Sequence, residues 1–175
     1  MVVDQTQPGT DAASLRQILA PMVRDSCTYV GISGTVEGIR DLKLGFRQAD
    51  IALDYIQRED SSQWILPFGD CALSYIRSRA LEELPAEMLA DETLGILRRH
   101  DEQSGTEYYK TLREYLLQER NIPQTAEALI IHRTTLTYRL QKIQQLLKLD
   151  LEDSNKRLYL LLSFYLMEHG GGAAR

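Results

Sequence analysis

The residues with the clearest chemical potential lie between positions 121 and 147, and their types and spacing are typical of nucleic-acid binding. Pro123 suits the first turn of a short helix over residues 123–130, because its ring fixes φ and its missing N–H would have no helical partner there. After a turn around Ile130–His132, the periodicity predicts a longer helix over Arg133–Leu147. A short helix, a tight turn and a longer helix form a helix-turn-helix, whose second helix can enter the major groove of DNA.

The predicted second helix has two chemically different faces. Its apolar residues recur at i, i+4, i+7 and i+11, namely Leu136, Leu140, Ile143 and Leu147. At 100° per residue these four fall within about 60° of one another, so they form one buried stripe. The opposite face carries hydroxyl groups, amides and cations but no carboxylate, as a surface facing base edges and phosphates requires.

Individual roles follow from position along the helix-turn-helix. The first turns of the second helix point into the groove, so the candidates for base-edge contacts are Arg133, Thr134, Thr137 and Tyr138. The candidates for phosphate contacts are Arg139, Lys142, and Gln124 or Thr125 at the start of the first helix, where backbone N–H groups also point outward. His132 could cap the second helix, contact a phosphate or be merely exposed, and we favour a cap or a contact.

Charge is distributed unevenly along the 175 residues. The net charge is −5, with 20 basic and 25 acidic side chains, which taken alone disfavours a nucleic-acid ligand. Residues 1–105 carry ten basic and seventeen acidic side chains, whereas residues 106–175 carry ten basic and eight acidic ones. Residues 120–148 contain five basic side chains and a single acidic one, Glu127. The basic window therefore coincides with the predicted helix-turn-helix.

The rest of the pattern predicts a mainly α fold with an α+β N-terminal portion. Helices are expected over residues 14–24, with Ser14 as N-cap, and over 41–57, with strands over 28–33 and 63–68 and a short helix over 72–80. Pro85 marks a break, and the later helices are expected over residues 92–100, 106–119, 123–130, 133–147 and 155–168. We expect an α+β portion over residues 1–85 and an all-α domain over residues 86–175.

The C-terminal pattern resembles a known family. Thr111-Leu-Arg-Glu-Tyr-Leu, Thr125-Ala-Glu-Ala-Leu, His132-Arg-Thr-Thr-Leu-Thr-Tyr-Arg-Leu and Leu149-Asp-Leu follow one another in the order and spacing of the C-terminal helix-turn-helix domain of PucR/CdaR-type bacterial transcriptional regulators. The resemblance spans about Leu94–Leu166 and differs at Thr134, where the family typically has Asn. It implies sequence-specific binding of double-stranded DNA through Arg133–Leu147.

The N-terminal portion is similar to the later part of the GGDEF-like domain that precedes this helix-turn-helix in the same family. The likeness lies in Gly31-Ile-Ser-Gly34, in residues 46–53 and in Ile65-Leu-Pro-Phe-Gly-Asp70. No Gly-Gly-Asp/Glu-Glu-Phe signature occurs, so nucleotide cyclisation is not implied. The resemblance implies that the chain is the C-terminal portion of a longer regulator or a short relative of one, and that a small-molecule effector acts through a sensing region outside this chain.

Enzymatic and metal chemistry find no support in the sequence. The adjacent acidic pairs Glu82-Glu83, Asp91-Glu92 and Asp101-Glu102 point in different directions and are interpreted as solvated surface. The three histidines are scattered without a ligand partner at i+3 or i+4, so neither a metal nor another cofactor is expected. Ser33 lacks the second glycine of a nucleophile elbow, since Thr35 stands there. We expect a protein that is not an enzyme.

The last predicted helix is apolar nearly all round, so it is either a core helix or buried on one side by a partner subunit. We favour a homodimer, because helix-turn-helix proteins commonly place two recognition helices about one DNA turn, ~34 Å, apart. The candidate dimerisation residues are Leu158, Leu161, Leu162 and Tyr165.

The sequence also bears on the location of the protein and leaves one alternative to DNA binding. The N-terminus has no basic region leading into an apolar core, and no apolar run approaches the ~20 residues of a membrane helix, so a cytoplasmic protein with reduced cysteines is expected. The alternative to DNA binding is a protein-interaction or dimerisation module that does not itself bind DNA.

Overall fold

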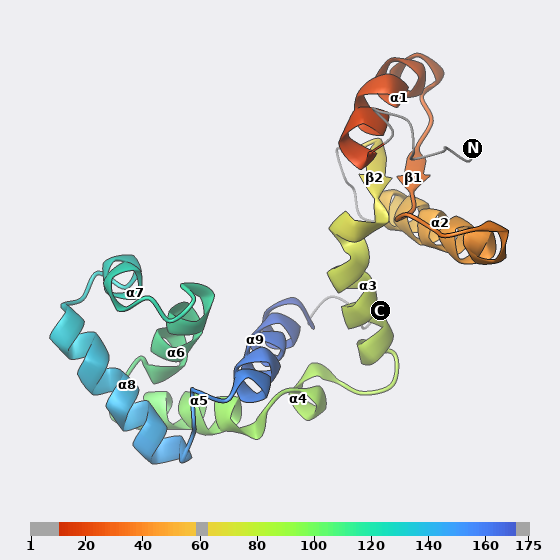
Figure 1. The fold of residues 1–175 in the computed structure, drawn as a ribbon. Coiled ribbons are helices and arrows are strands. Elements are labelled where there is room, and N and C mark those ends of the chain that lie inside the picture. The colour runs from red at the N-terminus through yellow and green to blue at the C-terminus, as the bar shows by residue number, and fades with distance from the viewer. Residues whose placement is uncertain (1–10, 59–62, 171–175) are drawn as a thin grey trace. The chain divides into compact units, whose positions relative to one another are not determined.

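The computed structural model of the chain describes residues 11–58 and 63–170 (Figure 1). This part is mainly helical, as predicted, with one two-stranded sheet. Its elements are α1 (Ala12–Ser26), β1 (Val30–Ile32), the 3-10 turn η1 (Ile39–Asp41), α2 (Leu42–Arg58), β2 (Ile65–Pro67), α3 (Phe68–Leu81), α4 (Ala86–Leu89), α5 (Glu92–Ser104), α6 (Tyr108–Leu117), α7 (Ile122–Ala128), α8 (Arg133–Leu147) and α9 (Ser154–His169).

The chain forms two compact units that divide inside α3, between Ser78 and Arg79. We call the N-terminal one unit 1 and the C-terminal one unit 2. The sequence placed the boundary between the α+β portion and the all-α domain after residue 85, a few residues later along the chain than this division.

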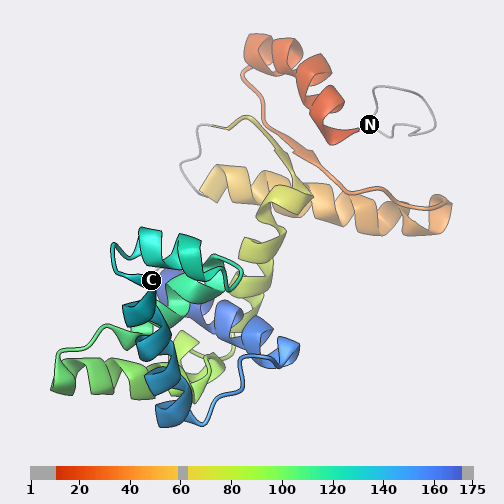
Figure 2. The ribbon, with the colours of Figure 1, turned by 60° about the vertical axis from the view of Figure 1, so that its left-hand side comes forward.

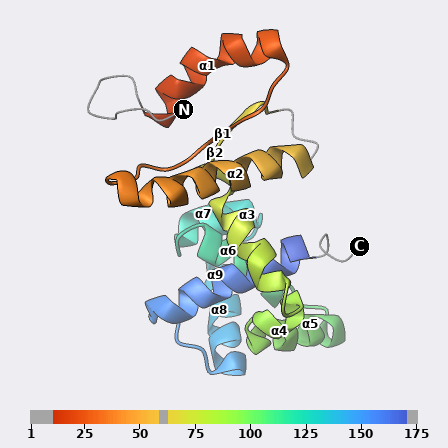
Figure 3. The same ribbon diagram turned by 90° about the vertical axis from the view of Figure 1, so that its right-hand side faces the viewer.

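Unit 1 places its two strands between α1 and α2, as Figures 2 and 3 show from two directions. The strands are parallel and pair Val30 with Ile65, and Ile32 with Pro67. Gly31 is required at this point, because a Cβ there would lie 1.9 Å from the backbone oxygen of Ala49 in α2. The close approach of β1 to α2 therefore depends on a residue without a side chain.

Local sequence signals explain the ends of α1. The side chain of Asp11 accepts hydrogen bonds from the backbone N–H groups of Ala13 and Ser14, so Asp11 is the N-cap and the expected cap at Ser14 was wrong. The helix ends at Cys27, which adopts the left-handed conformation with φ 51°. Aspartate is as good a cap as serine, and the sequence pattern did not separate two candidates so close together.

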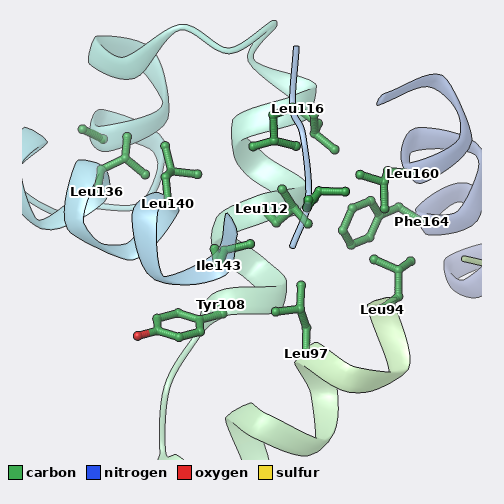
Figure 4. Packing of buried hydrophobic residues seen from close by; sticks show 13 residues of the cluster. Leu94, Leu97, Tyr108, Leu112, Leu116, Leu136, Leu140, Ile143, Leu160 and Phe164 are labelled. Atoms are coloured by element: carbon green, nitrogen blue, oxygen red, sulfur yellow. The ribbon is translucent and has the colours of Figure 1, made fainter. Parts of the chain in front are cut away.

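Unit 2 is built around α6, which packs against α5, α7, α8 and α9. Its buried side chains form one cluster that draws on α5, α6, α7, α8, α9 and the α8–α9 connection. Figure 4 shows Leu112 of α6 at its centre, with Ile143 of α8 and Phe164 of α9 pointing towards it. The helix-turn-helix is thus fixed to a core that it shares with α5, α6 and α9.

Helix α4 was not predicted, because four residues are too few for a helical period. The likeness of residues 1–85 to a GGDEF-like domain is not tested by these observations and stays a prediction. Among the described residues, every helix falls short of the length and apolar character that a membrane crossing demands.

Candidate nucleic-acid interface

Helices α7 and α8 form the predicted helix-turn-helix. Asn121 caps α7 by accepting a hydrogen bond from the backbone N–H of Gln124 at 3.1 Å, and Pro123 lies in the first turn. The connecting turn contains Ile130 at φ 55°, a left-handed conformation that β-branched residues rarely adopt. His132 then caps α8: its Nδ1 accepts from the backbone N–H of Thr134 at 3.4 Å. The predicted capping role of His132 is therefore observed.

Helix α8 buries the stripe that the periodicity predicted. Leu136 and Ile143 are fully buried and Leu140 is nearly so, while Leu147 is half-buried at the C-terminal end. In Figure 4 the side chains of Leu140 and Ile143 point towards α6. The burial of this stripe orients α8 about its own axis, and so determines which residues face solvent.

The opposite face of α8 is exposed and carries no acidic residue. It presents hydroxyl groups, amides, a phenol and cations. The Lys142 ammonium lies 5.6 Å from the centroid of the Tyr138 ring. The exposed residues of this face, together with its cap, are His132, Arg133, Thr134, Thr135, Thr137, Tyr138, Gln141, Lys142 and Gln145. We call this set the outer face of α8. It holds six of the nine predicted DNA-binding residues.

Arg139 lies beside the core instead of on the outer face. Its guanidinium donates to the Glu107 carboxylate at 3.1 Å and to the Thr111 hydroxyl at 3.2 Å, and only 22% of its side chain is exposed. Thr111 is itself fully buried and donates to the backbone oxygen of Glu107. These contacts tie α8 to the start of α6 and leave the Arg139 guanidinium less available for the expected phosphate contact, which stays a prediction.

The two candidates on α7 also differ from expectation. Thr125 is fully buried, and its hydroxyl donates to the backbone oxygen of Asn121 at 2.7 Å, so its side chain does not reach a ligand. Gln124 is exposed, but its backbone N–H is taken by the Asn121 cap, and Pro123 has none to offer. At the start of α7 the N–H groups of Gln124 and Thr125 are therefore occupied within the protein, and of these two residues only Gln124 has an exposed side chain.

Ion pairs reduce the free charge of the basic window. Arg120 donates to the Glu152 carboxylate at 2.8 Å and to the backbone oxygen of Leu151, which fixes the α6–α7 turn to the α8–α9 connection. The hydrogen bond with Glu152 raises the pKa of Arg120 and lowers that of Glu152. In the described part of the chain, Arg133, Lys142 and Lys148 are the exposed cations of residues 120–148 and make no ion pair.

Two acidic residues that we predicted to be solvated support unit 2 from within. Asp101 accepts from the Thr106 hydroxyl at 2.5 Å and from the backbone N–H groups of Tyr108 and Tyr109, each at 2.8 Å, so it caps α6 from the end of α5. Asp91 is 5% exposed and accepts from Thr93 and from Lys156 of α9. A carboxylate caps a helix when backbone N–H groups across a turn reach it. The occurrence of two acidic residues side by side in the sequence does not show whether such N–H groups are near.

The surroundings of Asp91 also affect its ionisation. Burial opposes the charged form, but hydrogen bonds from Lys156 and Thr93 outweigh it and hold the pKa of Asp91 below its ordinary value. The backbone N–H of Asp91 donates to the Ser163 hydroxyl at 2.8 Å, and Ser163 donates to the backbone oxygen of Tyr159. Through these contacts the start of α5 is attached to α9.

Helix α9 distributes the candidate dimerisation residues over different environments. Leu158 is 67% exposed, whereas Leu161, Leu162 and Tyr165 are half-buried, and Leu161 packs against the core of unit 2. The neighbouring Tyr159 donates its hydroxyl to the backbone oxygen of Leu89 in α4. The exposed large apolar residues of α9 are therefore Leu158 and Tyr159, in its N-terminal half.

Metal ligands are not brought together. Among residues 11–58 and 63–170, no three His, Cys, Asp or Glu side chains lie close enough to hold a metal ion. Cys27 and Cys71 are both unpaired, the first exposed and the second buried. Burial raises the pKa of the Cys71 thiol, which makes it less reactive than an exposed thiol.

Comparison with known proteins agrees with this geometry. Residues 108–166 match the PucR C-terminal helix-turn-helix domain. The chain is 34% identical over 144 residues to a Bacillus subtilis protein named proline-responsive transcriptional activator PutR, a match that covers 80% of this chain and 34% of that protein. It is 30% identical over 128 residues to an uncharacterized protein of Haemophilus influenzae, which covers 73% of this chain and 33% of that protein.

These matches confirm the predicted resemblance for the helix-turn-helix part. No solved structure matches the chain. The chain spans about a third of the length of the curated relatives it matches.

Proposed function

Because residues 108–166 carry a PucR-type helix-turn-helix domain, we propose that this chain binds double-stranded DNA as part of a transcriptional regulator. Helix α8 enters the major groove with its outer face towards the bases. The observation that carries the proposal is that face: it is exposed and free of acidic residues, although the chain as a whole has a net charge of −5. A helix that buries one stripe and presents only neutral and basic groups on the other is suited to a polyanionic groove.

Contacts to DNA divide into two kinds. Arg133 and Lys142 lie at the edges of the outer face, and both are exposed, so they are placed to meet phosphates or a guanine beside the groove. Thr134, Thr137 and Tyr138 are exposed and uncharged, so they are candidates for base edges. Gln124 and Lys148 add peripheral contacts, while Arg139 maintains the position of α8 from the core side.

The number of unpaired cations sets an expected salt dependence. Each phosphate neutralised contributes about −0.9 to the slope of log K against log salt concentration. With Arg133, Lys142 and Lys148 as the contributing cations, the slope is expected near −3 for one chain and near −5 for two chains on one duplex. Binding should therefore weaken strongly between ~50 and ~200 mM salt.

The test is a fluorescence anisotropy titration of the chain against random duplex DNA at both salt concentrations. Lys142→Ala should weaken binding to all sequences alike and reduce the magnitude of the slope by about 1. Arg99→Ala is the matched control, because Arg99 is an exposed cation on α5 and away from α7 and α8 in the sequence. Absence of binding at the lower salt concentration, with circular dichroism showing folded protein, would overturn the proposal and favour a protein-interaction module.

We further propose that the regulator acts as a homodimer and responds to a small-molecule effector through a region outside this chain. Leu158 is 67% exposed, the most exposed apolar residue of α9, and is therefore our candidate for contact with a partner subunit. Response to an effector is what the name of the Bacillus subtilis relative states for that protein. Light scattering of the chain and of Leu158→Ser, each with and without duplex DNA, tests the dimer: a mass that is the same for both proteins would exclude Leu158 from its interface.

A further inference from the structure

We infer that Gln141 is a specificity-determining residue of α8 and that its side-chain amide selects an adenine in the DNA site. The inference rests on the proposed function, because it requires α8 to lie in the major groove. Gln141 is exposed and belongs to the outer face, but its position and its lack of protein partners distinguish it from its neighbours.

The buried stripe of α8 determines which residues lie at the centre of the outer face. Moving two residues along a helix rotates by 200°, which is close to the opposite side. The stripe opposite Leu136, Leu140, Ile143 and Leu147 therefore consists of Thr134, Tyr138, Gln141 and Gln145. None of these four is charged, so the centre of the face is neutral and the cations Arg133 and Lys142 lie towards its edges.

Hydrogen bonds within the protein occupy several other polar groups on this face. The Thr134 hydroxyl lies 2.8 Å from the Nδ1 atom of the His132 cap, and the Thr137 hydroxyl donates to the backbone oxygen of Arg133 at 3.0 Å. Lys142 lies over one side of the Tyr138 ring. By contrast, the amide of Gln141 makes no hydrogen bond to any described residue, so both its donor and its acceptor are available to a ligand.

The chemistry of the amide selects the base. A glutamine side chain presents one donor and one acceptor side by side, which match N7 and N6 of adenine in the major groove. Guanine offers two acceptors there and is matched by the two donors of an arginine instead. Gln141 is the ninth residue of α8 and Gln145 the thirteenth, so of the two amides that of Gln141 lies nearer the N-terminal part, where the base contacts of a recognition helix concentrate.

The experiment is selection of preferred sites from a random duplex pool by the whole chain, followed by titration of the best site and of all single-base changes in it. The unmodified chain should prefer adenine over other bases at one position by about 5- to 150-fold. Gln141→Ala should lose that preference at that position alone. Gln141→Arg should change it from adenine to guanine, and because the readout is a ratio between sites, the added charge does not affect the result.

Gln145→Ala is the matched control, since it removes an identical side chain from the same stripe and should leave the adenine preference unchanged. If the unmodified chain binds selected sites and both Gln141 variants keep the same preference at every position, the inference is overturned while the proposed function stands. If the folded, unmodified chain enriches no sequence and binds no duplex, the proposed function itself has failed.

Discussion

The two units bury their apolar residues to very different extents. Unit 2 has one continuous core to which five helices contribute, with Leu97, Leu112 and Leu136 fully buried. Among the residues of unit 1 that the structure describes, the buried cluster consists of Ala52, Ile56, Leu66 and Cys71, and Leu19 and Val23 are buried outside it. Since stability comes largely from apolar area removed from water, unit 2 has the stronger basis for maintaining a defined geometry.

The two units also differ in how many of their large apolar side chains are exposed to solvent. In unit 1, large apolar side chains stay more than half exposed on α1, η1, α2 and α3, namely Ile18, Met22, Ile39, Leu44, Phe46, Leu73 and Ile76. In unit 2 the large apolar residues exposed to that extent are Met88, Ile130, Tyr138 and Leu158. The comparison indicates that the position of α8 is determined within unit 2, and that unit 1 has apolar surface that its described residues leave uncovered.

The largest expected effect comes from the centre of the unit 2 core. Leu112→Ala should lower the free energy of unfolding of unit 2 by about 3 kcal/mol, because a fully buried leucine leaves a cavity among α5, α8 and α9. Chemical denaturation measures the loss, and hydrogen exchange by mass spectrometry should place the faster exchange in α5–α9. Leu117→Ala on the same helix is the control: Leu117 is half exposed, so a loss equal to that of Leu112→Ala would contradict the assigned core.

A smaller effect is expected from the buried ion pair that joins the start of α5 to α9. Asp91→Asn should cost unit 2 about 2 kcal/mol at neutral pH, because the charged hydrogen bond with Lys156 is lost. The pKa of Asp91 is lower folded than unfolded, so its contribution is complete above the unfolded value, about 4, and is lost as pH falls through the folded value. Denaturation from pH 7 to pH 3 measures the difference between the two proteins, which should shrink on acidification; a constant difference would exclude ionisation as its cause.

A substitution at Ile130 is expected to increase the stability of the protein instead of lowering it. Its left-handed φ of 55° strains a β-branched residue, and its side chain is 91% exposed, so Ile130→Gly removes strain and almost no packing. The variant should be more stable by roughly 0.5–1 kcal/mol, after the greater flexibility of glycine in the unfolded chain is subtracted. Ile130→Ala keeps a Cβ at the same φ and should gain less. A glycine variant less stable than the original in chemical denaturation would show that the turn is not strained.

The smallest effect is expected on α2 of unit 1. Phe46 is 76% exposed, so Phe46→Ser should change the free energy of unfolding by less than about 0.5 kcal/mol. Chemical denaturation followed by circular dichroism over a range of protein concentrations measures this. A loss above 1 kcal/mol that grows with concentration would mean that a second copy covers this part of unit 1 in solution, and the contrast between the units would then apply to the isolated chain only.

The sequence predicted the bounds of α8 and its buried stripe correctly, because both are local. Four apolar residues at helical spacing and a capping residue at His132 determine them without knowledge of the rest of the fold. The partners of Arg139 were missed, since Glu107 lies 32 residues away. The burial of Thr125 was missed for a similar reason, because it depends on how α7 packs against its neighbours.

The hydrogen bond by which His132 caps α8 indicates which ring nitrogen of the neutral His132 imidazole carries the proton. A backbone N–H only donates, so the contact from Thr134 requires a lone pair on Nδ1 of His132. The cap therefore predicts the neutral tautomer that is protonated on Nε2, in which this nitrogen is a donor. In the proposed complex with DNA, this Nε2–H is the group that would donate a hydrogen bond to a phosphate oxygen. Nitrogen-15 NMR of the imidazole distinguishes the two tautomers directly.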